Sequence, residues 1–128
     1  RPWQMSSFEV MDQLLATLTA TFPNLTTISI VGHSAGGQYV QRYASTRNDD
    51  RIAYIVSAPS SYMYFSADRP GLTCNKYNEY KYGLEDLEDV PYMGNLGAAR
   101  LVDNYRQANV TYLVGSADDD ISDPSLDT

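Results

Sequence analysis

Histidine, cysteine and long apolar runs are scarce in this sequence of 128 residues. Its single cysteine, Cys74, can form no disulfide within the chain, and one thiol cannot make a structural zinc site. No apolar run approaches the roughly 18 residues that span a bilayer, which excludes a membrane span in this sequence. Basic residues are also few: 9 Lys and Arg stand against 16 Asp and Glu, a net charge of −7. A basic nucleic-acid-binding surface is therefore not expected.

What is present suits a folded protein. Hydrophobic residues make up 43% of the sequence and aromatic residues 12%, enough for a globular core, and the length fits one domain. The sequence begins at Arg1 without a methionine and stops at Thr128 after an acidic run, and neither end resembles a natural terminus. We therefore expect a single but partial domain over 1–128. Cytoplasmic and secreted locations both stay open.

Helical and strand patterns alternate along the chain. Ser6 and Glu9 form a capping-box pattern, and apolar residues at helical spacing follow it. Two short β-branched runs flank a second helical pattern, and Gly32 is expected to end the first of them. Strands separated by helices predict an α/β fold with a parallel sheet and flanking helices. The expected helices cover 7–21, 35–45 and about 96–105, and the expected strands cover 27–31, 52–56 and 110–114.

The stretch 59–94 differs in composition from the rest of the chain and is predicted to be a cap-like insertion with short helices at most. It holds three of the six prolines, Cys74 and six tyrosines. These tyrosines either line an acyl or aryl pocket or pack the insertion onto the sheet, and the second role is favoured for most of them. They are Tyr62, Tyr64, Tyr77, Tyr80, Tyr82 and Tyr92.

The segment from Gly32 to Gly36 matches the pattern G-x-S-x-G between an expected strand and an expected helix. Such a turn holds its serine, here Ser34, in a strained backbone conformation, and only glycine is expected to fit at the flanking positions Gly32 and Gly36. The Ala35 N–H at the helix start can donate to a tetrahedral oxyanion. The alternatives are a turn formed for packing alone or a phosphate-binding turn, but neither nucleotide-binding glycine pattern is present. The context favours a nucleophilic Ser34.

The residues 28–37, ISIVGHSAGG, resemble the nucleophile elbow of the α/β-hydrolase fold, of the serine esterase and lipase type. The segments 38–44, 59–62 and 81–85 are similar to a poorly characterised branch of these hydrolases in fungi and bacteria. The resemblance covers the whole chain as the middle of the fold. It implies a three-layer α/β/α architecture, α/β-hydrolase-like and incomplete at both ends.

In that family the catalytic triad follows the chain order serine, acid, histidine, with the acid just beyond a later strand. Asp118 fits that place, with Asp119 and Asp120 as alternatives, or it is an ordinary solvated loop acid. The only histidine, His33, adjoins Ser34, so the two side chains should diverge and His33 should not serve as the base. The resemblance places the missing histidine after Asp118 and the second oxyanion donor before Arg1.

These features predict a fragment of a serine hydrolase that cleaves carboxylic esters by acyl transfer. An amidase or peptidase of the same fold is an alternative, as is a catalytically inactive hydrolase-fold protein that binds a ligand or partner. The expected substrate is a small-molecule ester or amide. No metal or organic cofactor is implied, and protein partners stay unknown. Without a triad histidine, the 128 residues alone should be almost inactive.

Overall fold

A computed structural model describes residues 5–71 and 74–117. Helix α1, Ser7–Thr21, has the bounds that the sequence predicts. Its capping box is present, because the Ser6 side chain accepts the Phe8 N–H at 3.2 Å and the Glu9 carboxylate accepts the Ser6 N–H at 2.6 Å. Phe8 and Leu15 turn inward from this helix and are buried. The start signal and the apolar spacing thus define the same helix.

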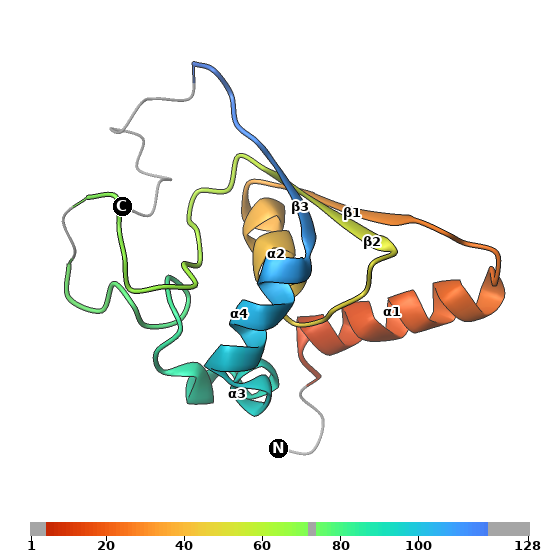
Figure 1. Cartoon of the computed structure of the whole chain (residues 1–128), viewed down its shortest axis with the longest axis horizontal. Coiled ribbons are helices and arrows are strands. Elements are labelled where there is room, and N and C mark those ends of the chain that lie inside the picture. Colours follow the sequence, from red (N-terminus) through yellow and green to blue (C-terminus); the bar gives the residue numbers. More distant parts are fainter. Residues whose placement is uncertain (1–4, 72–73, 118–128) are drawn as a thin grey trace.

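In the described part of the chain, three parallel strands form the sheet, in the order β1-β2-β3 (Figure 1). They are β1 (Ile28–His33), β2 (Ile52–Ser57) and β3 (Asn109–Leu113), so the predicted parallel α/β sheet is confirmed. The expectation that Gly32 ends the first strand is wrong, because β1 runs on to His33, which pairs in register with Ser57. Ser57 in turn pairs with Leu113, so the carboxyl ends of all three strands share one edge.

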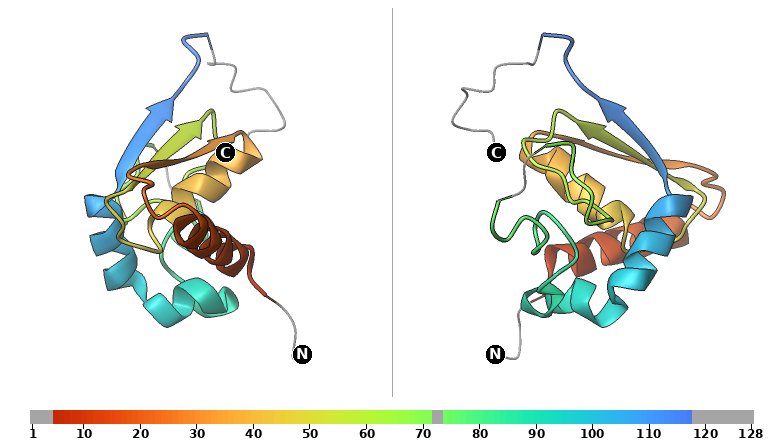
Figure 2. Two further views of the ribbon diagram at one scale, coloured as in Figure 1. Left: turned by 90° about the vertical axis from the view of Figure 1, so that its right-hand side faces the viewer. Right: turned by 60° about the vertical axis from the view of Figure 1, so that its left-hand side comes forward.

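The helices lie on one face of this sheet, as Figures 1 and 2 show. Helix α2 (Ala35–Ala44) connects β1 to β2, and α4 (Ala98–Gln107) precedes β3. Both connections step in the same direction across the sheet, so crossovers of one hand bring both helices to the same face. On the opposite face Val31 stays 63% exposed. Within the described residues the architecture therefore has two layers, and the second helical layer of the three-layer prediction is not among them.

The core lies between the sheet and its helical layer. Tyr43 of α2 and Tyr54 of β2 are almost completely buried there with their rings edge to face, and Phe8 of α1 stacks on Tyr43. Burying side chains of this size contributes roughly 1.5–3 kcal/mol each. No helix in the described part of the chain is both long and apolar enough to cross a membrane.

The described residues of the segment 59–94 are mostly irregular, as the sequence predicts, with a short 3₁₀ turn, η1 (Leu87–Asp89), and the start of α3 (Pro91–Leu96) as their helical parts. The apolar spacing predicts a helix that begins at about Leu96. Leu96 is instead the last residue of α3, and α4 begins two residues later. Arg69 organises part of the segment, since its guanidinium lies 4.3 Å from the centre of the Tyr64 ring and donates to the Tyr77 carbonyl at 2.8 Å. Contacts of this side chain thus connect parts of the segment that no regular element joins.

Candidate active site

Ser34 occupies the turn between β1 and α2 in a conformation that non-glycine residues rarely adopt. Its backbone angles are φ 55° and ψ −120°. Such strain persists only where the surroundings enforce it, and it is the conformation expected of a serine at a sharp strand-to-helix turn. Ser34 is exposed, and its hydroxyl makes no capping hydrogen bond to α2. The side chain is therefore held at the surface with its hydroxyl unused by the helix.

Backbone hydrogen bonds fix this turn to the neighbouring strand. The Ser34 N–H donates to the Ser57 carbonyl at 2.9 Å, and the Gln38 N–H donates to the Ser34 carbonyl at 3.0 Å. One residue after β2, the Ala58 N–H donates to the Leu113 carbonyl at 2.8 Å. The carboxyl ends of the three described strands are thus joined by hydrogen bonds along one edge of the sheet, and Ser34 lies at this edge.

The glycines around Ser34 differ in how much space they have. A Cβ on Gly32 would lie 2.1 Å from the Gly36 carbonyl oxygen, and one on Gly37 would lie 2.7 Å from the Ser57 carbonyl oxygen. A Cβ on Gly36 would meet nothing within 4 Å. The expected crowding is therefore found at Gly32, but it is wrong for Gly36, whose missing side chain would point into open space. Gly37 instead allows α2 to approach β2 closely.

The start of α2 offers hydrogen-bond donors beside the Ser34 hydroxyl. Ala35 is the first residue of the helix, and the N–H groups of a first helical turn have no partners within the helix. No acidic residue lies in this turn, so no carboxylate within the turn offsets the positive end of the helix dipole. Negative charge that develops near Ser34 would be stabilised by these groups, which is the property an oxyanion site requires.

His33 turns toward β2. Its Nδ1 atom lies 3.2 Å from the Ser57 hydroxyl, and within the described residues no hydrogen bond joins its ring to Ser34. Asp118 and its alternatives Asp119 and Asp120 lie outside the described residues. The structure does locate the end of β3, at Leu113. This end lies two strands from the end of β1, about 10 Å away at the usual strand spacing.

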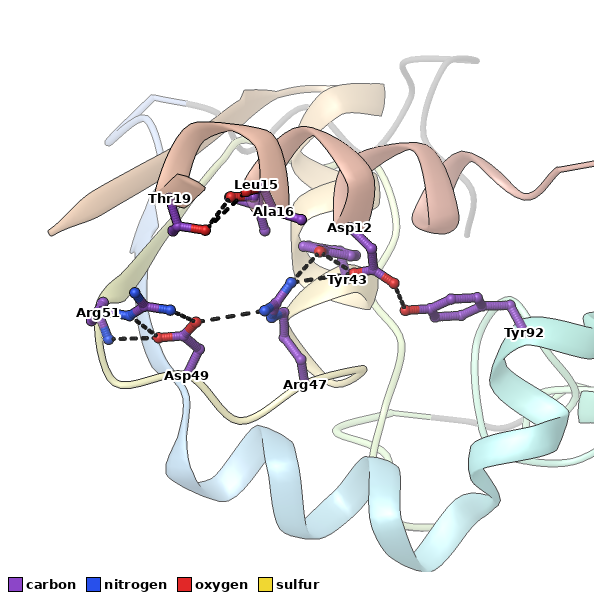
Figure 3. Close-up of polar contacts among 9 residues, drawn as sticks. All are labelled: Asp12, Leu15, Ala16, Thr19, Tyr43, Arg47, Asp49, Arg51 and Tyr92. Carbon is purple, nitrogen blue, oxygen red and sulfur yellow. Dashed lines mark hydrogen bonds and ion pairs between the residues drawn. The ribbon is translucent and has the colours of Figure 1, made fainter. Parts of the chain in front are cut away.

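A polar cavity of about 450 Å³ lies at the other edge of the sheet, where β1 and β2 begin. Asp12 of α1 lies on its wall, close to Tyr43, Arg47 and Tyr92 (Figure 3). Its carboxylate accepts hydrogen bonds from the Tyr43 hydroxyl at 2.6 Å, from Arg47 at 3.3 Å and from the Tyr92 hydroxyl. Asp12 thereby joins α1 to α2 and α3. No sequence motif indicates this cluster, because its members are far apart in the chain.

The charges in this cavity are compensated within the chain. Asp49 accepts from Arg51 at 2.8 Å, which lowers the pKa of Asp49, and Arg47 lies 3.5 Å from the same carboxylate. Burial together with the Asp12 contact raises the pKa of Tyr92 to about 12. Two carboxylates and two guanidinium groups balance, so we assign the cluster a structural role in joining helices.

Comparison with protein-family models, with curated proteins and with solved structures finds no match to this chain. Within residues 5–71 and 74–117, no three side chains of His, Cys, Asp or Glu are grouped so that they could hold a metal ion. The local geometry around Ser34 and the chemistry of the groups near it are therefore the features that point to a function.

Proposed function

We propose that this chain is part of a serine hydrolase of the α/β-hydrolase type that cleaves carboxylic esters, with Ser34 as the nucleophile. One observation carries the proposal: Ser34 adopts a strained conformation at a strand-to-helix turn, exposed and with its hydroxyl unused as a cap. Backbone strain at a polar residue is concentrated at functional sites. The parallel sheet supports the same assignment, since the reactive edge of such sheets is the one where the strands end.

In this mechanism the Ser34 oxygen attacks the carbonyl carbon of the ester while its proton passes to a general base. The carbonyl oxygen becomes an oxyanion and accepts a hydrogen bond from the Ala35 N–H at the start of α2. The tetrahedral intermediate expels the alcohol, which takes up the proton from the base. Water then attacks the acyl-serine in the same way, which releases the carboxylic acid and restores Ser34.

The proposal assigns the general base to a histidine that is not among these 128 residues. Their single histidine, His33, contacts the Ser57 hydroxyl and adjoins Ser34 in the chain. We assign Asp118 the role of orienting that base, because it follows β3, which ends on the same edge of the sheet as Ser34. Amide or peptide substrates would use the same groups, and the ester assignment follows the resemblance to esterases.

The test uses the product of the complete reading frame that encodes this chain and measures hydrolysis of p-nitrophenyl esters of increasing acyl length. We expect Ser34→Ala to lower kcat by about three orders of magnitude or more, with KM little changed. The matched control is Ser29→Ala, an exposed serine on β1, the strand that precedes Ser34, and this variant should retain full activity. A folded product that hydrolyses no ester or amide would instead support a binding protein and overturn the proposal.

A further inference from the structure

A second cavity, of about 280 Å³, lies where the segment after β2 passes α2, α4 and β3. Five aromatic side chains line it: Tyr62, Tyr64 and Phe65 from that segment, Tyr105 from α4 and Tyr112 from β3. None of the residues that the structure places around it carries a charge. The cavity is therefore suited to an uncharged, apolar group and unsuited to an ion.

The walls of this cavity are held in place by contacts among the lining residues. Phe65 stacks on Tyr105 with ring centres 4.0 Å apart, and Tyr62 packs on Tyr112 at 5.7 Å. Beneath them the Gln41 amide is fixed, because it donates to the Met63 carbonyl at 3.0 Å and accepts the Met63 N–H at 2.8 Å. Aromatic faces held in this way form a largely preformed surface for another ring.

Two tyrosine hydroxyls provide hydrogen-bonding groups in this otherwise mostly apolar cavity. The hydroxyls of Tyr105 and Tyr112 are hydrogen-bonded to each other. Burial and this contact raise the pKa of Tyr105 above its usual value, so its hydroxyl stays protonated at neutral pH. The pair holds two protons and uses one between its members, which leaves one O–H to donate to a ligand oxygen.

The cavity is connected to the edge that carries Ser34. Tyr112 of the cavity wall is followed by Leu113, whose carbonyl accepts the Ala58 N–H. The residue before Ala58 is Ser57, whose carbonyl accepts the Ser34 N–H. Four residues further on, Tyr62 enters the cavity wall. The segment from Ser57 to Tyr62 thus runs from the strand end that holds the turn at Ser34 to the wall of the cavity.

We infer that this cavity binds an uncharged single-ring aromatic group that bears a hydrogen-bond acceptor, the aryl group of an aryl ester. The volume is about twice that of the roughly 150 Å³ cavity that is known to bind benzene in an engineered protein. The binding site stands on the cavity itself, whereas its role in substrate selection rests on the function proposed above.

The probes are phenol, toluene and cyclohexanol, and the protein is the product of the complete reading frame. Calorimetry and changes in amide chemical shifts measure the binding of each probe. We expect phenol to bind at least about fivefold more tightly than cyclohexanol, which lacks a π-face. Phe65→Leu should weaken phenol binding by about fivefold or more, because it removes a stacked ring. Tyr77→Leu is the matched control, since Tyr77 packs against Arg69 outside the cavity and should not alter binding.

A double variant, Tyr105→Phe with Tyr112→Phe, provides a second test that keeps both rings and removes both hydroxyls, because either hydroxyl alone could still donate to the ligand. It should weaken phenol binding by about two- to tenfold, the effect of one hydrogen bond, and leave toluene binding unchanged. Equal affinities for phenol and cyclohexanol, or chemical shifts that change away from the cavity, would overturn the inference. So would unchanged phenol binding by the double variant and by a folded Phe65→Leu variant.

A kinetic comparison separates this inference from the proposed function. The ratio of kcat/KM for phenyl acetate to kcat/KM for cyclohexyl acetate should be larger for the wild type than for Phe65→Leu, which removes a stacked ring from the cavity. Ester hydrolysis that depends on Ser34 without any aryl preference would sink the substrate inference and leave the hydrolase proposal intact. Phenol binding in the cavity without ester hydrolysis would contradict the hydrolase proposal and leave the binding site intact.

Discussion

The backbone N–H of Ser34 donates to the carbonyl oxygen of Ser57 at 2.9 Å, so the last residue of β2 holds the turn that follows β1. The same carbonyl oxygen lies 2.7 Å from the position that a Cβ on residue 37 would take. The location of the Ser34 hydroxyl therefore depends on contacts between backbones. Substitutions that separate these backbones should disturb the turn even when they leave Ser34 itself unchanged.

Gly32 and Gly36 should respond in opposite ways to alanine. Gly32→Ala places a Cβ 2.1 Å from the Gly36 carbonyl oxygen, and we expect a loss of about 2–3 kcal/mol in the free energy of unfolding or a failure to fold. Gly36 lies in helix α2, and the Cβ added by Gly36→Ala would meet no atom within 4 Å. It should stabilise the protein by about 0.5–1 kcal/mol. Urea denaturation checks both, and equal effects would contradict the described turn.

Asp12→Ala should be strongly destabilising, because it removes the acceptor shared by Tyr43, Tyr92 and Arg47. We expect a loss of about 2–3 kcal/mol in the free energy of unfolding. The matched control is Asp103→Ala, an aspartate 69% exposed on α4, which should change stability by less than about 0.5 kcal/mol. Similar losses for the two variants would show that the Asp12 cluster does not join the helices.

Stability should fall in alkaline solution. Burial raises the pKa of Tyr54 and of Tyr92 to about 12, above the value of about 10 for an unfolded tyrosine. Between these values the unfolded chain has lost protons that the folded chain still holds, so the free energy of unfolding decreases as pH rises. The contribution is complete below pH about 10 and is lost as pH rises toward about 12.

Urea denaturation at a series of pH values measures this decrease. Within the described residues the Tyr54 hydroxyl has no hydrogen-bond partner, so Tyr54→Phe should keep its stability at neutral pH and reduce the alkaline loss. A wild-type protein whose stability is constant through this range would contradict the raised pKa values.

Gln41→Glu should destabilise the fold although it preserves side-chain size. The buried Gln41 amide both donates to and accepts from the Met63 backbone, and a carboxylate cannot donate. We expect a loss of about 2–3 kcal/mol in the free energy of unfolding at neutral pH. Gln13→Glu on the exposed side of α1 serves as the control and should be nearly neutral. Equal behaviour of the two variants would mean that the segment after β2 is not held by Gln41.

Local signals explain what the sequence could predict. The capping box at Ser6 and Glu9 defined the start of α1, and β-branched runs located the strands within one or two residues. Strained turns also have local signatures, which is why Ser34 could be singled out. Gly36 was misjudged because its spatial surroundings, unlike its motif position, depend on which way α2 leaves the sheet.

The contacts between distant residues could not be predicted in this way. Asp12 meets Tyr43 and Tyr92, which lie 31 and 80 residues further along the chain. Tyrosines of the segment 59–94 likewise divide between packing and cavity walls according to the positions of α4 and β3. Neither arrangement leaves a periodic or motif signal, because tertiary packing alone brings these residues together. Asp118 lies outside the described residues, and its role stays a prediction.

Covalent labelling of Ser34 is the most direct test of the proposed nucleophile. The product of the complete reading frame would be treated with a fluorophosphonate, and its peptides analysed by mass spectrometry. We predict one phosphonate on the peptide that contains Ser34, and none after Ser34→Ala, whereas Ser29→Ala should label like the wild type. A folded protein that takes up no phosphonate, or takes it up on another serine, would contradict the assignment of Ser34 as the nucleophile.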